Sequence, residues 1–176
     1  MLHKTVLITG ASRGIGKATA TIFAQSGYHL VLICYTSIKE LEEFAQELRR
    51  IWNISVHTFS VDLSDSSNIK ELFEIQMPSK GVPPIDILIN NAGISHIGLF
   101  TQLSEPKLLE ILHTNLISTM LCSQYVLPHM IQIQSGRIIN ISSVWGNVGA
   151  SMEVAYSTSK AGLNGFTRAL AKEVAP

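Results

Sequence analysis

The stretch Thr9–Gly16, which reads T-G-A-S-R-G-I-G, decides the fold. It joins a short apolar run to residues 14–25, whose apolar positions recur with helical spacing. Gly10 permits a tight turn, Gly14 has no side chain to block a pyrophosphate, and Gly16 lets a helix pack closely on a sheet. Because a helix N-terminus offers free N–H groups and positive potential, the stretch predicts a phosphate-binding turn for a dinucleotide. A purely structural turn is the alternative.

Apolar strands and helices alternate along the chain on the C-terminal side of this turn. The expected strands are residues 5–9, 28–34, 54–61, 85–89 and 137–141, and the expected helices are residues 14–25, 38–51, 66–77, 106–131 and 154–174. Continuous apolar strands between helices predict a parallel sheet covered on both faces. We therefore expect one domain over residues 1–176 with a three-layer, doubly wound α/β (Rossmann) fold, in which ligands bind beyond the carboxyl ends of the strands.

The composition is that of an apolar globular protein. Hydrophobic residues make up 46% and charged residues 15%, and the 13 basic residues balance the 13 acidic ones. This balance argues against a nucleic-acid or anionic-membrane partner. Cys34 and Cys122 are expected as reduced core cysteines, and no metal site is expected. Residues 111–133 have no charged side chain except histidine, but their polar residues favour a buried helix over a membrane span. With no signal peptide at the N-terminus, we expect a cytoplasmic protein.

The end of the second expected strand bears on which dinucleotide binds. NAD-binding proteins commonly place an acid there for the ribose 2′-hydroxyl, whereas residues 33–37 read I-C-Y-T-S, without a carboxylate. Arg13 lies in the glycine turn, where a guanidinium could clamp a 2′-phosphate, and Thr36 and Ser37 could add hydroxyl donors. The alternative for Arg13 is a solvated surface charge. The pattern favours NADP(H).

Two further strand ends offer contacts for the adenosine half of a dinucleotide. Asp62 ends the third strand and could either bond the adenine amino group or cap the following helix. Asn90 begins the turn N-N-A-G, where Ala92 and Gly93 allow close approach of the backbone. A turn without a ligand role is the alternative for this second motif.

The candidate reacting groups converge from three segments. Tyr156 and Lys160 are four residues apart on a helix and share a face, so the ammonium can favour the phenolate and lower the pKa of the phenol. Tyr156 could then protonate a carbonyl oxygen as hydride arrives at the carbon. Ser142 and Ser143 end the fifth strand, and because neighbours point to opposite faces, we expect one of them to bond the substrate. Asn115 lies in an apolar helix, where an amide needs a partner, which neighbouring backbone could also supply.

The chain resembles the short-chain dehydrogenase/reductase superfamily along its whole length. The motifs that carry the resemblance are, in order, T-G-A-S-R-G-I-G, N-N-A-G, the asparagine of H-T-N-L, I-S-S and Y-S-T-S-K. The resemblance implies a catalytic tetrad of Asn115, Ser143, Tyr156 and Lys160, with Ser143 chosen because it lies thirteen residues before the tyrosine. It also implies that Asn115 holds a water linking Lys160 to solvent, and that Lys160 binds the nicotinamide ribose.

With these implications, the expected cofactor contacts are Thr9, Gly10, Ser12, Arg13, Gly14, Ile15, Gly16, Thr36, Asp62, Leu63, Asn90, Ala92, Gly93, Tyr156 and Lys160. The expected substrate contacts are Ser143, Trp145 and Tyr156. The resemblance further implies a homodimer or homotetramer formed through the helices at residues 106–131 and 154–174.

Within the superfamily, G-R-I-I-N-I-S-S-V-W-G and A-L-A-K-E-V-A-P resemble the bacterial 3-oxoacyl-(acyl-carrier-protein) reductases. The resemblance implies reduction of a small or carrier-bound ketone. The stretch from Ile141 to Tyr156 is also similar to reductases of the 5-aminopentanone modification of elongation factor P. In it, Glu153 could attract a substrate ammonium, or it could simply favour the start of a helix.

Members of the superfamily continue beyond the point where this sequence ends. The resemblance implies a further strand, a proline-glycine turn on the nicotinamide and a substrate-covering segment after Pro176. We therefore expect the sheet to lack the last strands of the family fold and the fifth strand to keep an apolar edge. The alternatives are a fragment of a full enzyme and a truncated product that binds nucleotide or dimerises without turnover.

Overall fold

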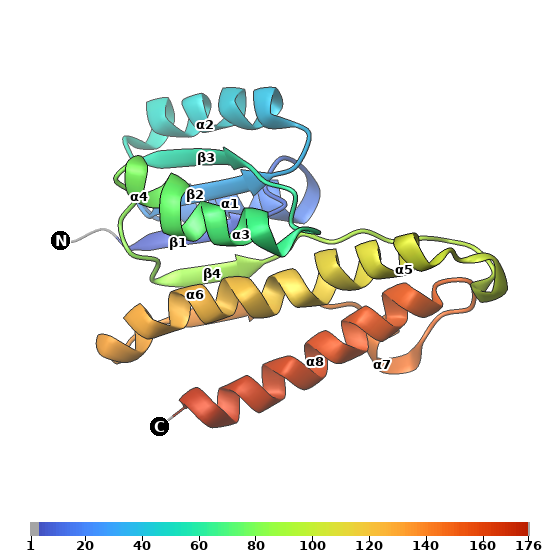
Figure 1. Ribbon diagram of the computed structural model, residues 1–176. Helices are drawn as coiled ribbons and strands as arrows, with labels where there is room; N and C mark the ends of the chain where they lie inside the picture. The colour runs from blue at the N-terminus through green and yellow to red at the C-terminus, as the bar shows by residue number, and fades with distance from the viewer. Residues whose placement is uncertain (1–3, 176) are drawn as a thin grey trace.

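The computed structural model describes residues 4–175, and its centre is a five-stranded parallel sheet (Figure 1). The strand order is β3-β2-β1-β4-β5, which confirms the doubly wound fold. The strands are β1 Thr5–Thr9, β2 His29–Cys34, β3 Val56–Ser60, β4 Ile87–Asn90 and β5 Arg137–Asn140. All carboxyl ends lie at one edge of the sheet, on the side where the last helix begins (Figure 1).

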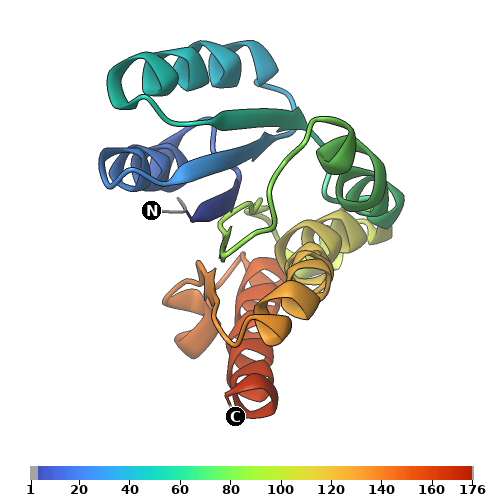
Figure 2. The ribbon, with the colours of Figure 1, turned by 90° about the vertical axis from the view of Figure 1, so that its left-hand side faces the viewer.

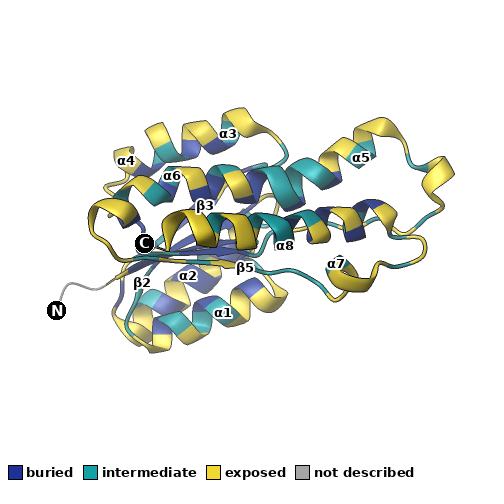
Figure 3. Cartoon of the chain, turned by 90° about the horizontal axis from the view of Figure 1, so that it is seen from below, coloured by how far each residue is buried: buried dark blue, intermediate teal, exposed yellow. Residues whose placement is uncertain are grey.

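Helices cover both faces of this sheet and form the outer layers (Figures 2 and 3). The α-helices are α1 Gly14–Gln25, α2 Ile38–Trp52, α3 Ser66–Glu71, α4 Met77–Ser79, α5 Glu105–Leu112, α6 Ser118–Gln132, α7 Trp145–Val148 and α8 Val154–Val174. A 3-10 turn, η2, spans Phe100–Gln102. Helices α1 and α2 lie on one face, and α3, α6 and α8 lie on the other. The predicted bounds of α1 and α8 are confirmed.

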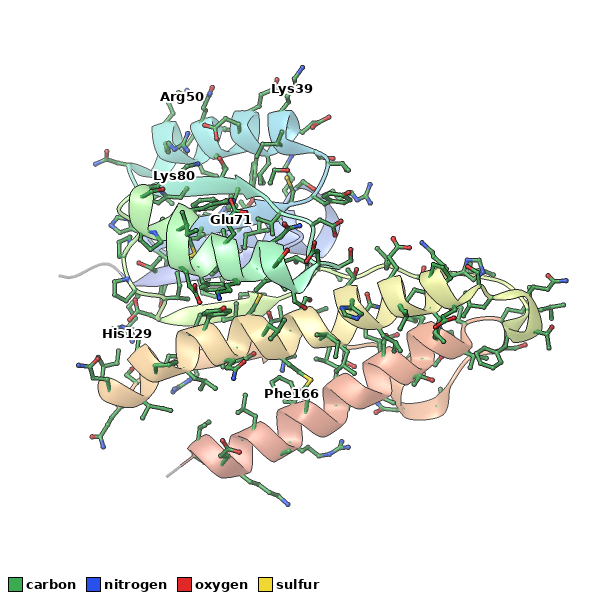
Figure 4. All side chains as sticks on the ribbon, viewed as in Figure 1. Lys39, Arg50, Glu71, Lys80, His129 and Phe166 are labelled. Atoms are coloured by element: carbon green, nitrogen blue, oxygen red, sulfur yellow. The ribbon has the colours of Figure 1, made fainter. Side chains whose placement is uncertain are left out.

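The two faces of the sheet build two separate cores. Val6 and Ile8 pack toward α1 and α2, whereas Leu7 packs toward α3 and α6. Because successive side chains of a strand point to opposite faces, a strand covered on both sides has to be apolar throughout. Helix α2 shows the complementary pattern, since Lys39 and Arg50 point outward from the sheet (Figure 4).

Two predicted helices contain a wide turn that the sequence pattern did not indicate. The expected helix 66–77 is observed as α3, the π-helical turn η1 Leu72–Gln76 and α4, and it ends at Ser79, two residues later than predicted. Pro78 lacks an N–H for the carbonyl four residues before it, and the wider turn absorbs this break. The expected helix 106–131 is likewise divided by η3 His113–Ile117, where the Ser118 N–H bonds to the His113 carbonyl, five residues back.

The two cysteines are buried and free of disulfide bonds, as predicted. Burial raises the pKa of the Cys122 thiol to about 12 and also raises the pKa of Cys34. Among residues 4–175, no helix is long and apolar enough to cross a membrane. In the same described range, His, Cys, Asp and Glu side chains do not gather in threes as a metal site requires.

Candidate active site

The glycine turn between β1 and α1 is shaped by three different constraints. Gly10 has a φ of +65°, and a Cβ there would lie 3.0 Å from the Ala92 Cα. A Cβ on Gly16 would collide with the Gly10 carbonyl oxygen, so α1 packs against the turn as closely as backbone allows. Gly14 instead faces open space, with nothing within 4 Å of an added Cβ. The structure thus keeps clear the position predicted to admit a pyrophosphate.

Asn91 fixes this turn, a role that the sequence analysis did not assign. Its Nδ2 donates to the carbonyl oxygens of Thr9 and Gly10, at 3.0 Å each. In return, the Thr9 hydroxyl oxygen accepts the N–H groups of Asn91 and Ala92, also at 3.0 Å. The sequence could have indicated this role, because Asn91 directly follows a strand. An amide side chain at the end of one strand can bond the backbone at the end of the neighbouring strand. These bonds lock the ends of β1 and β4 together.

The predicted adenosine contacts differ in how far the structure supports them. The Asp62 carboxylate accepts the Ser64 N–H at 2.9 Å and the Ser64 hydroxyl at 2.7 Å. Asp62 does not cap the next helix, because the N-cap of α3 is Asp65, whose side chain accepts the Ser67 N–H. The capping alternative was therefore wrong, while contact with adenine stays a prediction. Leu63 is 7% exposed and belongs to the core on the α3 and α6 side, so its predicted contact with the cofactor stays a prediction.

The Asn90 side chain lies inside the protein. It is 3% exposed, and its Nδ2 donates to Asn140 Oδ1 at 2.9 Å and to Ser123 Oγ at 3.3 Å. The amide therefore links β4 to β5 and α6. The Nδ2 group is thus engaged inside the protein, and the contact between Asn90 and a nucleotide stays a prediction.

Tyr156 and Lys160 lie on the first turns of α8, as predicted. The Lys160 Nζ lies 5.7 Å from the centre of the Tyr156 ring and donates a hydrogen bond of 2.8 Å to the Ile141 carbonyl. Lys160 is 4% exposed, and burial lowers its pKa below the ordinary lysine value. Among the described residues that line the site, Lys160 is the one cationic side chain, and its bond to Ile141 holds it near the Tyr156 ring.

The hydroxyl groups of the two serines after β5 have different hydrogen-bond partners. The Ser142 hydroxyl donates to the Lys160 carbonyl at 3.3 Å and so helps to place α8. The Ser143 Oγ accepts the Trp145 N–H at 3.2 Å at the start of α7, which leaves its hydroxyl proton available. Both residues border the same cavity. The expectation that one serine serves the substrate is consistent with these different partners.

Asn115 is completely buried in the wide turn η3 and bonds across to the loop after β4. Its Oδ1 accepts the Ile94 N–H at 2.8 Å, and its Nδ2 donates to the Ile94 carbonyl at 2.8 Å and to Ser159 Oγ at 3.0 Å. A Cβ on Gly93 would lie 3.4 Å from the Asn115 Oδ1 and 3.5 Å from the Lys160 Nζ. The alternative of a backbone-bonded amide is confirmed, and the predicted water beside Lys160 stays a prediction.

These groups surround a cavity of about 350 Å³ at the carboxyl edge of the sheet. Its lining consists of Ile15, Asn91, Gly93, Ile94, Ser95, Ile141, Ser142, Ser143, Trp145, Glu153, Tyr156 and Lys160. Ile15 belongs to the glycine turn and is 61% exposed, so the cavity adjoins the N-terminus of α1. Trp145 lines this cavity together with Ser143 and Tyr156, and its contact with a substrate stays a prediction.

The residues present fit a dinucleotide at this edge. Gly14 leaves open space, and the N-cap residue Arg13 makes no side-chain cap, so α1 presents its first N–H groups outward. Arg13, in the turn after β1, and Thr36, in the segment after β2, are both exposed. The glycine turn after β1, the segment after β2 and the reacting candidates near β5 therefore all lie at the carboxyl edge of the sheet.

Comparison with known proteins agrees with this arrangement. The family model for short chain dehydrogenases matches residues 4–176. The 3-oxoacyl-(acyl-carrier-protein) reductase FabG of Aquifex aeolicus is 42% identical over 98% of this chain and 68% of its own length. The uncharacterized oxidoreductase YmfI of Bacillus subtilis is 37% identical over 99% of this chain and 70% of its own.

A solved structure extends the likeness to three dimensions. The short-chain dehydrogenase from Sphingobium yanoikuyae, in complex with NADPH, superposes with a TM-score of 0.89 at 32% identity. The match covers 98% of this chain and 66% of that one. Sequence, fold and site thus agree, and the chain belongs to the short-chain dehydrogenase family of oxidoreductases.

Proposed function

We propose that this protein reduces a ketone to a secondary alcohol with NADPH. The observation that carries the proposal is the buried Lys160 ammonium, 5.7 Å from the centre of the Tyr156 ring. Ser143 and the glycine-turn residue Ile15 line the same cavity. A proton donor, a buried cationic side chain and the glycine turn therefore border one cavity, and carbonyl reduction uses such groups together.

NADPH, when bound, supplies the hydride. We assign its phosphates to the turn around Gly14 and to the N-terminus of α1. Arg13 and Thr36 are assigned to the 2′-phosphate, because β2 ends without a carboxylate that would repel it. Lys160 is assigned to the nicotinamide ribose.

The protein's own groups then handle the proton. Ser143 holds the carbonyl oxygen through its hydroxyl, and the Tyr156 hydroxyl donates a proton to that oxygen as the alcohol forms. The Lys160 ammonium stabilises the phenolate left behind, because an adjacent positive charge favours the ionised phenol. Asn115 positions this centre by bonding Ile94 and Ser159, the residue before Lys160. The resulting phenolate recovers its proton from solvent before the next turnover.

The substrate we favour is a 3-oxoacyl thioester on acyl carrier protein. The 42% identity to the Aquifex aeolicus reductase supports this choice. We also propose that the working protein is a cytoplasmic homodimer or homotetramer that pairs through α5, α6 and α8. Helix α8 packs beside α5 and α6 along the surface of the molecule, so these helices offer one continuous face (Figures 1 and 2).

Tyr156→Phe tests the assigned acid. The change removes the proton donor and keeps the ring, so kcat for acetoacetyl thioester reduction should fall by about a thousandfold or more. NADP⁺ affinity, measured by calorimetry, should stay within about threefold because the phosphate contacts are untouched. Activity that survives this change would refute the role of Tyr156. Turnover by the 176-residue chain alone would exclude the alternative of a fragment that binds nucleotide without catalysis.

One observation favours a second substrate class. Glu153 is the N-cap residue of α8, yet its side chain makes no cap hydrogen bond, and it lines the cavity. It has no ion-pair partner among residues 4–175. A carboxylate in this position would attract the ammonium of an aminoketone, such as the 5-aminopentanone group on elongation factor P.

The kinetics of Glu153→Gln with the two ketones show whether Glu153 recognises an ammonium. If the aminoketone is natural, Glu153→Gln should lower kcat/KM for a 5-aminopentanone by about tenfold, since it removes one charge pair at a partly buried site. The same change should leave an acetoacetyl thioester within about twofold. Equal effects on both ketones would show that Glu153 does not recognise an ammonium.

A further inference from the structure

We propose that Gly146 is a positioning residue of the active site, an inference that rests on the proposed function. Gly146 is the second residue of α7, the short helix that follows the two serines at the end of β5. It acts through its neighbours Ser143 and Trp145, which line the cavity. Its missing side chain sets how closely α7 approaches the main chain of α8 at Lys160.

The side of α7 that faces α8 has no room for a side chain at Gly146. A Cβ built there would lie 2.8 Å from the Lys160 carbonyl carbon, 2.9 Å from its carbonyl oxygen and 3.0 Å from its Cβ. Two of these atoms belong to the main chain of α8 and cannot rotate away, as the tip of a long side chain could. Because α7 has 4 residues and α8 has 21, a side chain at this position has to push α7 outward.

Two hydrogen bonds hold α7 and the loop after it against the first turns of α8 (Figure 1). The Asn164 Nδ2 donates to the Asn147 Oδ1 at 3.0 Å. The Ala150 N–H donates to the Ser157 hydroxyl oxygen at 3.1 Å. A methyl group that wedges the two helices apart at Gly146 would strain both bonds, so the bonds and the glycine together give α7 one close distance from α8.

The start of α7 carries the group that we assign to the substrate carbonyl. The Trp145 N–H donates to the Ser143 Oγ at 3.2 Å, and the Gly146 N–H donates to the Ser143 carbonyl at 3.0 Å. These bonds tie Ser143 to α7, whereas Tyr156 belongs to α8. The distance between the two hydroxyl groups therefore follows the gap between the helices, and a displacement of about 1 Å can cost about a hundredfold in rate.

Gly146→Ala tests the proposal. The added methyl group should move Ser143 away from Tyr156 and lower kcat for acetoacetyl thioester reduction by about thirtyfold. The Kd for NADP⁺, measured by calorimetry, should stay within about twofold, and the alkaline limb of the pH profile of kcat should not move, because Tyr156 and Lys160 both belong to α8. Gly165→Ala, in α8 with open space around the added Cβ, is the matched control and should keep kcat within about twofold.

Asn147→Ala provides a second test that adds no atoms and that stands if Gly146→Ala does not fold. It removes one bond between α7 and α8, so kcat should fall by about fivefold. In a Ser143→Ala background the same change should lower kcat by less than about twofold, because α7 acts through Ser143. Equal losses in the two backgrounds would overturn the proposal.

The outcomes distinguish this proposal from the one on which it rests. Unchanged kcat in Gly146→Ala, with an unaltered circular dichroism spectrum, would overturn the role of Gly146 alone. A loss of NADP⁺ affinity as large as the loss of kcat would also overturn it, because the substitution would then disturb the whole site. If the original protein binds NADP⁺ and reduces no ketone, the proposed function itself falls, and the role of Gly146 falls with it.

Discussion

Ser142 and Ser143 are adjacent, yet their hydroxyl groups have different partners. Ser142 donates to the main chain of α8, whereas Ser143 only accepts a hydrogen bond from the Trp145 N–H. The sequence could not choose between them on geometry, because alternation along a strand says only that they diverge. The choice of Ser143 rested on its spacing from Tyr156, and its free donor agrees with that choice.

Replacing each serine by alanine in turn tests which of the two hydroxyl groups acts in catalysis. Ser143→Ala should lower kcat by about a hundredfold, since it removes a donor aimed at the oxygen where charge develops. Ser142→Ala removes one structural hydrogen bond and should cost about 1 kcal/mol of stability with less than a fivefold change in kcat. Steady-state kinetics and urea titration measure both. Similar kinetic losses in the two variants would contradict the assignment.

Among the helices, the difference between prediction and structure lies in the wide turns. Helices α1 and α8 begin and end as predicted, because glycine or proline stands at or near their ends and their apolar spacing is regular. The turns η1 and η3 each hold a hydrogen bond that spans five residues instead of four. Apolar periodicity averages over a turn, so it does not reveal one such insertion. In η3, the insertion places Asn115 against the loop at Ile94.

Substitution by alanine should have opposite effects on stability at Gly16, where α1 packs against the glycine turn, and at Gly165, which faces open space. Gly16→Ala places a methyl group against the Gly10 carbonyl and 2.6 Å from Asn91 Nδ2, and should destabilise the protein by about 2 kcal/mol or more. Gly165→Ala, inside α8 with open space around it, should stabilise by about 0.5–1 kcal/mol. Urea denaturation of both variants checks the sign. A stabilised Gly16→Ala would disprove the close packing.

On the scale of the whole molecule, the two edges of the sheet differ in whether their outward main-chain groups have hydrogen-bond partners. At β3, the outward carbonyl of Val56 accepts two bonds from Arg49, at 2.6 and 3.0 Å, and the Thr58 carbonyl accepts one from Lys80. At β5, Ile138 and Asn140 point their main-chain groups outward with no partner among residues 4–175. The exposed Ile139 lies on this second edge, as expected of an apolar edge, whereas the cavity of about 580 Å³ beside it is lined mainly by polar side chains.

The difference between the two edges predicts that molecules aggregate through the open edge at β5. Ile139→Lys puts a charge on the open edge and should reduce aggregation, because edge lysines disfavour strand pairing between molecules. Arg49→Ala uncovers the Val56 carbonyl and should increase aggregation. Light scattering during incubation at 37 °C compares the variants with the original protein. If Ile139→Lys aggregates as fast as the original protein, the β5 edge is not the site of association.

The sequence by itself determined the fold class, the five strands, the glycine turn and the Tyr156–Lys160 pair, because these depend on local spacing and on apolar alternation. Only the tertiary structure decided the partners of buried polar groups. It directed Asn90 inward, gave Asp65 instead of Asp62 the cap of α3, and used Asn91 to lock the turn. The physical reason is that a hydrogen bond between residues tens of positions apart leaves no periodic trace along the chain, although it fixes which side chains can face a ligand.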